Sequence, residues 1–121
     1  MKHKNILESW GTAFGGFLFA LRYQKNIRIL LVIGVLVAAL SPFLGLKPVE
    51  YMILSVTISM VVITELVNSG LEYAIDLVTE DYHELAKAAK DVAAAAVLIS
   101  CANAVAVAGI WTLGKFGWLK S

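Results

Sequence analysis

Three long stretches of the chain carry no charged residue, and they constrain the fold more than any other feature. They cover residues 29–46, 51–64 and 92–114, which are 18, 14 and 23 residues long. A helix needs about 20 mostly apolar residues to cross a bilayer. The first and third stretches are long enough, and the second is if its helix continues past Glu65. The pattern predicts three transmembrane helices, over about residues 29–46, 50–71 and 92–114.

The overall composition agrees with a membrane protein. Hydrophobic residues make up 60% of the chain and the mean hydropathy is +0.79, whereas soluble domains are about half apolar. The net charge of +1 provides no basic surface for nucleic acid. The single cysteine, Cys101, excludes a disulfide within the chain. We expect an all-α integral membrane protein that forms one domain over residues 1–121.

The segments outside the three spans have distinct characters. Residues 41–48, SPFLGLKP, contain both prolines and predict a short break between two antiparallel spans. Residues 73–91 predict a polar linker with helical character at both ends, and residues 5–23 predict an amphipathic helix at the membrane surface. A cleaved signal peptide is an alternative for the first span, although residues 1–28 are a long segment to precede one.

The basic residues predict the orientation in the membrane. Cytoplasmic loops carry an excess of Lys and Arg. Most of the basic residues lie before the first span or in the 73–91 linker, so we expect the N-terminus and this linker in the cytoplasm. The cytoplasmic group is Lys2, Lys4, Arg22, Lys25, Arg28, Lys87 and Lys90, and the opposite group is Lys47, Lys115 and Lys120.

Acidic residues gather at the end of the second span. The segment 65–91 contains Glu65, Glu72, Asp76, Glu80, Asp81, Glu84 and Asp91. Such a segment is commonly a solvated face, and it is also suited to divalent cations. At 100° per residue, Glu65, Asn68, Glu72 and Asp76 fall within about 80° of one helix face. We call these four residues the acidic stripe.

Glu65 is the member of the acidic stripe that a hydrated helix rim explains least well. Its neighbours in MVVITELV are apolar, and an acidic residue inside a membrane helix is by default functional. Residues seven apart lie about 10 Å apart along a helix. We therefore expect Glu65 to meet the polar end of a lipid, and Glu72 and Asp76 to meet a soluble co-substrate or its Mg²⁺.

A lysine lies just before the third predicted span, at the same end of the molecule as these acids. Lys90 and Asp91 lie where the third span enters the membrane, and Lys90 is placed either to hold an anion or to anchor the helix. An acidic, metal-capable stripe facing a lysine suits phosphoryl transfer from a nucleotide. The sequence has no GxxxxGK[ST], GxGxxG or HExxH motif, which argues against a soluble nucleotide-binding or protease scaffold.

Residues 65–98, ELVNSGLEYAIDLVTEDYHELAKAAKDVAAAAVL, closely resemble the signature of the prokaryotic diacylglycerol kinase family. The motif E-x-x-N-S-x-x-E-x-x-x-D is long and specific. The form AKDVAAAAVL is more similar to the undecaprenol kinase branch of the family than to the diacylglycerol branch, which has AKDMGSAAVL. The resemblance implies a three-span, ATP- and Mg²⁺-dependent lipid kinase of the cytoplasmic membrane. It also implies a homotrimer with active sites shared between neighbouring subunits.

The resemblance also implies roles for individual residues. Glu65 would be the general base that takes the proton from the lipid hydroxyl, and Asn68 would position that hydroxyl and the γ-phosphate. Glu72 would bind the divalent metal. The nucleotide-binding residues would be Lys90, Asp91, Asp76, His83 and Glu84.

One position departs from the family pattern. The family has a second metal-binding glutamate just before the first span, in a pattern like ERN, and the matching segment here, YQKNIR, has Gln24. Glutamine offers an oxygen ligand without a charge, so it would bind the metal more weakly.

The sequence thus predicts phosphorylation of undecaprenol, with diacylglycerol as the alternative acceptor. Two other hypotheses are a catalytically weakened relative that binds lipid or partners, and an ion or proton channel built on the acidic stripe.

Overall fold

The computed structural model of the chain describes residues 5–117, and within them it consists of helices and short turns. The elements are α1 (Ile6–Tyr23), α2 (Lys25–Leu40), the 3-10 helix η1 (Ser41–Leu44), α3 (Pro48–Val78) and α4 (Glu84–Lys115). Among the described residues, three helical segments are long and apolar enough to cross a membrane: Lys25–Leu44, Pro48–Val78 and Glu84–Lys115. The predicted all-α class, with three such helices and an N-terminal helix, is confirmed.

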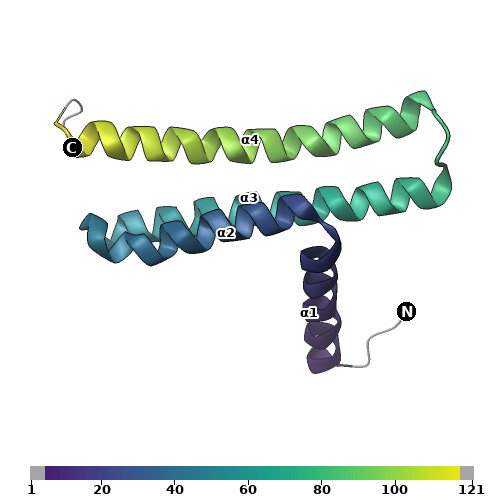
Figure 1. The fold of residues 1–121 in the computed structure, drawn as a ribbon, viewed down its shortest axis with the longest axis horizontal. Helices are drawn as coiled ribbons and strands as arrows, with labels where there is room; N and C mark the ends of the chain where they lie inside the picture. Colours follow the sequence, from purple (N-terminus) through teal and green to yellow (C-terminus); the bar gives the residue numbers. More distant parts are fainter. Residues whose placement is uncertain (1–4, 118–121) are drawn as a thin grey trace.

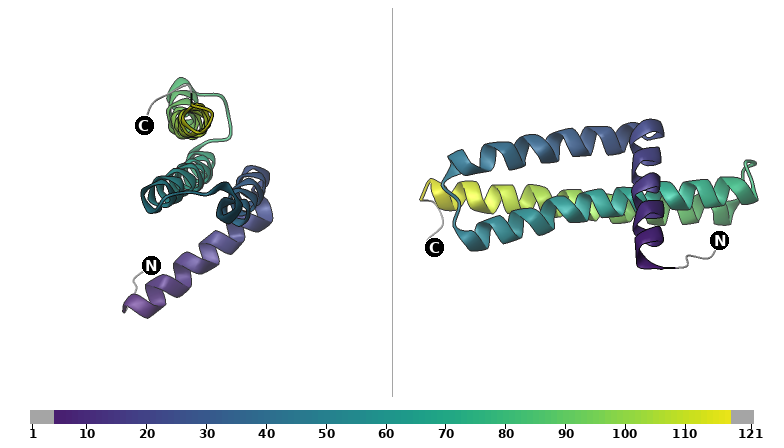
Figure 2. Two further views of the ribbon diagram at one scale, coloured as in Figure 1. Left: turned by 90° about the vertical axis from the view of Figure 1, so that its left-hand side faces the viewer. Right: turned by 90° about the horizontal axis from the view of Figure 1, so that it is seen from below.

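Helix α3 is the centre of the arrangement. It packs along α4, it contacts α2, and α1 contacts both α2 and α3. Helix α1 runs crosswise to the three long helices (Figure 1), and α2 and α4 lie on different sides of α3 (Figure 2). Gly34 lets α2 approach α3 closely, because a Cβ atom there would lie 3.1 Å from Cγ2 of Ile58.

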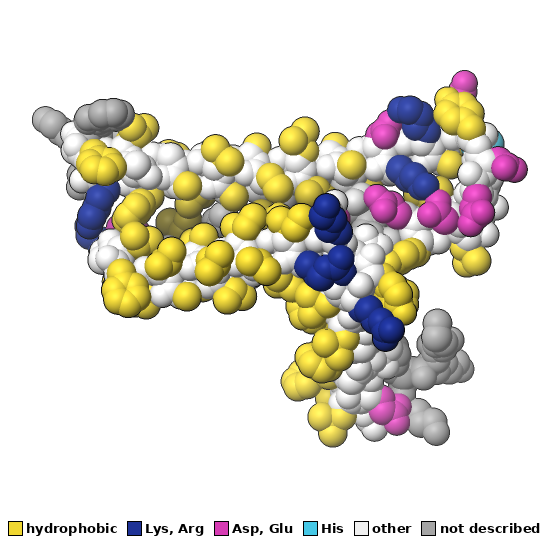
Figure 3. Space-filling model, viewed as in Figure 1, with side chains coloured by type: hydrophobic (Ala, Val, Ile, Leu, Met, Phe, Trp, Pro, Cys, Tyr) yellow, Lys and Arg dark blue, Asp and Glu magenta, His cyan; other side chains and the backbone are white. Residues whose placement is uncertain are grey.

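The side chains that the described chain buries are mostly polar. The buried hydrophobic residues are Ala20, Ile27 and Ala93, and the buried polar residues are Ser41, Thr57, Glu65, Asn68, Ser69 and Ser100. Large apolar side chains cover the outside of the long helices (Figure 3). Lipid accommodates an apolar surface, whereas polar groups inside a membrane face the protein interior. This distribution fits a multi-pass membrane protein.

The two connections between the long helices differ from each other. Gly45 adopts a left-handed conformation with φ 66° after η1, and Pro48 occupies the first turn of α3, where its missing N–H removes no helical hydrogen bond. The break predicted at 41–48 therefore lies between α2 and α3. The second connection comprises only residues 79–83, because both ends of the expected 73–91 linker are helical.

Helices α3 and α4 are longer than the apolar part of a bilayer is thick. Their 31 and 32 residues correspond to about 46–48 Å, against about 30 Å of hydrocarbon. Both helices extend past α1 at the same end of the molecule (Figure 1), and charged side chains gather there (Figure 3). We call this region, formed by the end of α3, residues 79–83 and the start of α4, the charged end. Three lysines used to predict the orientation, Lys2, Lys4 and Lys120, lie outside the described residues.

Candidate functional site

The acidic stripe begins with a carboxylate that the protein itself encloses. Glu65 is 4% exposed and Asn68 is 7% exposed. The side-chain amides of Asn26, from α2, and Asn68 lie close to the Glu65 carboxylate. One turn further along α3, Nδ2 of Asn68 donates to Oε1 of Glu72 at 3.3 Å. The amide of Asn68 therefore stands between two carboxylates on a single helix face and is hydrogen-bonded to that of Glu72.

The side chain of Asn68 retains an unused acceptor. Its Oδ1 atom is buried and has no hydrogen-bond partner among residues 5–117. A buried polar atom without a partner costs free energy, and the cost falls when a ligand supplies the missing bond. The Oδ1 atom is thus available to a polar group of a substrate at the level of Glu65.

An ion pair joins α3 to α4 further along the charged end. Nζ of Lys90 lies 2.6 Å from Oδ1 of Asp76, and their side chains are 40% and 47% exposed. The contact brings Lys90 to the acidic stripe, as the sequence pattern predicts for a facing lysine. Exposed ion pairs contribute little to stability, so a phosphate can replace Asp76 as the partner of this lysine at small cost.

The other residues expected at a nucleotide site lie around the 79–83 loop. His83 caps α4, because its Nδ1 accepts a hydrogen bond from the backbone N–H of Leu85 at 3.1 Å. Asp91 pairs with Lys87 at 2.6 Å, one turn away on an exposed face of α4. A shallow hollow of about 220 Å³ is lined in part by His83, Lys90 and Asp91.

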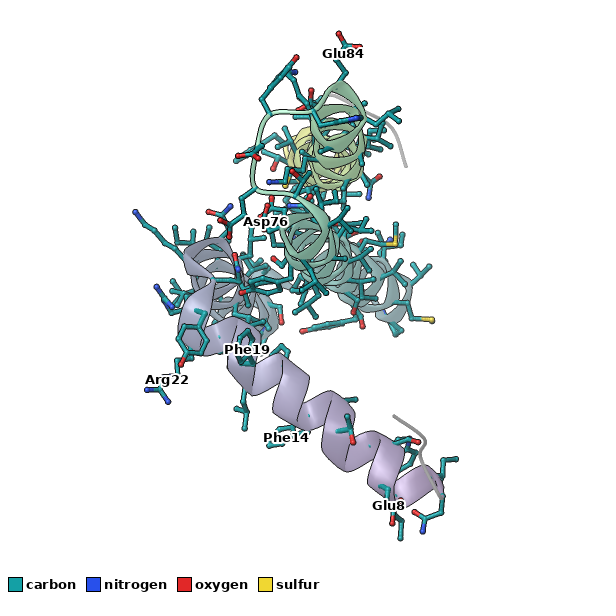
Figure 4. The ribbon with its side chains drawn as sticks, turned by 90° about the vertical axis from the view of Figure 1, so that its right-hand side faces the viewer. Glu8, Phe14, Phe19, Arg22, Asp76 and Glu84 are labelled. Atoms are coloured by element: carbon teal, nitrogen blue, oxygen red, sulfur yellow. The ribbon has the colours of Figure 1, made fainter. Side chains whose placement is uncertain are left out.

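The structure does not bring all five expected nucleotide residues to this hollow. Asp76 and Glu84 are absent from its lining. Asp76 reaches the group through its ion pair with Lys90, whereas Glu84 lies at the outer edge of the charged end when the molecule is viewed along the long helices (Figure 4). Glu84 also stands in the first turn of α4, where a negative charge favours the helix dipole.

The donors for a divalent metal are oxygen atoms spread along α3. Within residues 5–117 no group of three or more His, Cys, Asp or Glu side chains forms a ready-made metal cage. Mg²⁺ does not need one, because it commonly uses one or two carboxylates together with substrate phosphates and water. Glu72 has its second carboxylate oxygen outside the bond to Asn68. The acidic stripe therefore fits Mg²⁺ chemically when phosphates complete the ligand set.

Gln24 has a partner that the sequence did not indicate. It separates α1 from α2, and its Nε2 donates a hydrogen bond to the hydroxyl group of Tyr73, the residue after Glu72. Sequence reasoning missed Tyr73 and also Asn26. Tyr73 directly follows Glu72 in LEY, and Asn26 stands two positions after Gln24 in YQKNIR. This proximity was the signal that could have found them.

The fold and this site together define a small membrane protein with three helices of spanning length and a polar site that runs along α3 toward the charged end. The profile of the prokaryotic diacylglycerol kinase family matches residues 11–112, and the chain belongs to this family. The predicted resemblance is confirmed. The prediction of a lipid kinase is confirmed at the level of the family.

Three relatives illustrate the range of the similarity. A diacylglycerol kinase of Synechocystis is 42% identical over 106 residues, which cover 87% of this chain and 61% of the relative. An undecaprenol kinase of Bacillus subtilis is 33% identical over 107 residues, 82% of this chain and 87% of the relative. A diacylglycerol kinase of Pseudomonas aeruginosa is 31% identical over 97 residues, 80% of this chain and 79% of the relative. The chain spans less than two thirds of the length of the Synechocystis relative.

Proposed function

We propose that this protein transfers the γ-phosphoryl group of ATP to the hydroxyl group of a membrane lipid. The observation that carries the proposal is the enclosed Glu65 carboxylate, which lies beside the amides of Asn26 and Asn68 on a membrane-length helix. Such a carboxylate is costly to keep in a spanning helix unless it acts on a substrate. Membership of the diacylglycerol kinase family supports the same activity.

In the proposed reaction Glu65 is the general base. It takes the proton of the lipid hydroxyl while the hydroxyl oxygen forms a bond to the γ-phosphorus. The bond from the γ-phosphorus to the β–γ bridging oxygen breaks, and ADP leaves with the electron pair. Asn68 positions the reacting groups, and its unpaired Oδ1 supports this role.

The remaining roles concern the metal and the nucleotide. Glu72 and Gln24 hold Mg²⁺, which when bound offsets the negative charge of the phosphates. Lys90 exchanges Asp76 for a phosphate group. The partial exposure of both side chains, which lets a phosphate approach the lysine, supports this exchange. The other residues that we assign to the nucleotide site are Asp76, His83, Glu84 and Asp91.

The lipid that we propose as acceptor is undecaprenol. The form AKDVAAAAVL supports it, as does the similarity to the undecaprenol kinase of B. subtilis. Diacylglycerol is the second candidate, because the relatives from Synechocystis and P. aeruginosa carry the name diacylglycerol kinase. We also propose that residues 1–121 act as a single domain in the cytoplasmic membrane, with the N-terminus and the charged end on the cytoplasmic side.

A direct assay tests the function. Purified protein in lipid is given radiolabelled ATP, Mg²⁺ and either undecaprenol or diacylglycerol. We expect transfer of label to lipid, with undecaprenol as the better acceptor. Faster labelling of diacylglycerol would select the second candidate, and no labelling of either lipid by intact protein would overturn the kinase proposal. A weakened lipid-binding relative or a channel would give this last result.

We propose that the protein assembles as a homotrimer and that α4 contributes to the contacts. Ala102, Ala106 and Gly109 form a stripe of small residues on α4, and all three are exposed in the single chain. Asn103 is exposed nearby, and its side chain has no hydrogen bond among the described residues. Small residues let membrane helices approach closely, and polar side chains bond across helix contacts.

Replacing Ala106 with leucine is expected to weaken the oligomer, because the larger side chain keeps a second helix at a distance. Chemical cross-linking in lipid at several protein concentrations measures the effect. Ala108→Leu makes the same change on another exposed face of α4 and serves as the matched control. If both variants cross-link like the unmodified protein, this stripe does not form the interface.

A further inference from the structure

The corner between α1 and α2 is fastened by several hydrogen bonds around Gln24. The backbone N–H of Gln24 donates to the carbonyl oxygen of Ala20 at 2.8 Å, which closes the last turn of α1. Nη1 of Arg28 donates to the carbonyl oxygens of Leu21 and Arg22 at 2.9 and 2.8 Å. These bonds cap the end of α1 from the first turn of α2. These bonds therefore fix the backbone from which the side chain of Gln24 extends.

Tyr73 connects this corner to α3, at the position after Glu72 of the acidic stripe. Its hydroxyl group accepts the hydrogen bond from Nε2 of Gln24. The ring of Phe19 packs edge-on against the ring of Tyr73, with 5.7 Å between centroids. Phe19 also packs against the ring of Tyr23 in a tilted arrangement, with 4.6 Å between centroids. Figure 4 shows Phe19 where α1 meets the long helices. The side chain of Tyr73, on α3, thus contacts both α1, through Phe19, and Gln24, which lies between α1 and α2.

The direction of the hydrogen bond determines what Gln24 can offer to a ligand. A glutamine side chain ends in an NH₂ group that donates and an oxygen that accepts, and the two point in different directions from the amide carbon. Only the oxygen can bind a cation. Because Nε2 is engaged by Tyr73, the group that remains is Oε1. Tyr73 is also the residue next to Glu72, which we assign to the metal.

We propose that Tyr73 is a positioning residue, which orients the Gln24 amide so that its oxygen serves the metal site beside Glu72. The proposal rests on the proposed function of Glu72 and Gln24. The proposal explains how this chain could use Gln24 where the family pattern has a metal-binding glutamate. A neutral amide has no charge to attract the cation, so its orientation must be fixed by a neighbour.

The test uses Tyr73→Phe, which removes the hydroxyl group and keeps the ring that packs on Phe19. We expect the half-saturating Mg²⁺ concentration for lipid phosphorylation to rise about 3- to 10-fold, the usual effect of losing one hydrogen bond. The rate at saturating Mg²⁺ should stay within about twofold of that of the unmodified protein. Tyr51→Phe, near the other end of α3, is the matched control and should leave the Mg²⁺ curve unchanged.

Two further measurements separate positioning from a general loss of structure. The variant Gln24→Ala should show an equal or larger Mg²⁺ shift, because it removes the oxygen that Tyr73 orients. Adding Tyr73→Phe to it should cause no additional shift, because the tyrosine hydroxyl then has no amide to orient. Binding of Mn²⁺ in the presence of a non-hydrolysable ATP analogue, followed by electron paramagnetic resonance, should weaken in parallel without any turnover.

The outcomes distinguish this proposal from the proposed function. An inactive unmodified protein would refute the kinase activity, while the Mn²⁺ comparison would still test Tyr73. With an active protein, an unchanged Mg²⁺ curve and unchanged Mn²⁺ binding for Tyr73→Phe would refute the positioning role. Additive shifts from Tyr73→Phe and Gln24→Ala would refute it as well.

Discussion

Replacing Glu65 with glutamine is expected to lower the rate of lipid phosphorylation by about 10²- to 10⁴-fold, the usual contribution of a general base. Glutamine has nearly the same size as glutamate and can still bond to the amides of Asn26 and Asn68, so the fold around residue 65 should persist. The amide cannot accept the proton of the lipid hydroxyl. The loss should therefore appear in kcat and not only in the KM for lipid.

The assay compares turnover at saturating ATP, Mg²⁺ and lipid. Glu50→Gln is the matched control, because it changes a carboxylate on the same helix at the opposite end. Glu50 accepts a hydrogen bond from Nε1 of Trp111 at 2.8 Å, and a glutamine oxygen can accept the same bond. The control should keep near-normal turnover. Near-normal turnover of Glu65→Gln would show that another group takes the proton.

Sequence patterns were sufficient for the number and type of helices in this chain. Charge-free segments of membrane length leave few alternatives, because a backbone in lipid must satisfy its own hydrogen bonds within a helix. The extent of the 79–83 connection was harder to predict. Polar residues beyond residue 71 were compatible with either a loop or a helix projecting into water, and α3 continues to Val78.

Periodicity also placed the members of the acidic stripe on one face of α3, because positions along a single helix follow from its geometry. It did not identify which residues of other helices face that stripe. Asn26 stands 39 positions before Glu65, which it approaches in the structure. Tyr73 stands 49 positions after Gln24, to which it is hydrogen-bonded. Such contacts depend on how the helices rotate and cross, which one sequence does not specify.

The charge at the metal site provides the second large effect. Glu72 is the carboxylate that we assign to Mg²⁺, and Gln24 contributes no charge. Replacing Glu72 with glutamine would leave the site without a protein carboxylate from this pair. We expect Glu72→Gln to lose activity at any practical Mg²⁺ concentration, because phosphates and water alone do not fix the position of the cation against the protein.

The reverse change should strengthen the site. Gln24→Glu restores a charge, and at partly exposed positions such a charge is worth a few kcal/mol. The half-saturating Mg²⁺ concentration should therefore fall by about tenfold or more. The hydroxyl group of Tyr73 can still take part, because a tyrosine is able to donate to the new carboxylate where it accepted from the amide. Rates measured against Mg²⁺ for the unmodified protein, Gln24→Glu and Glu72→Gln test both expectations together. An unchanged Mg²⁺ curve for Gln24→Glu would mean that residue 24 does not contact the metal, and the role of Tyr73 would then be confined to holding α1 against α3.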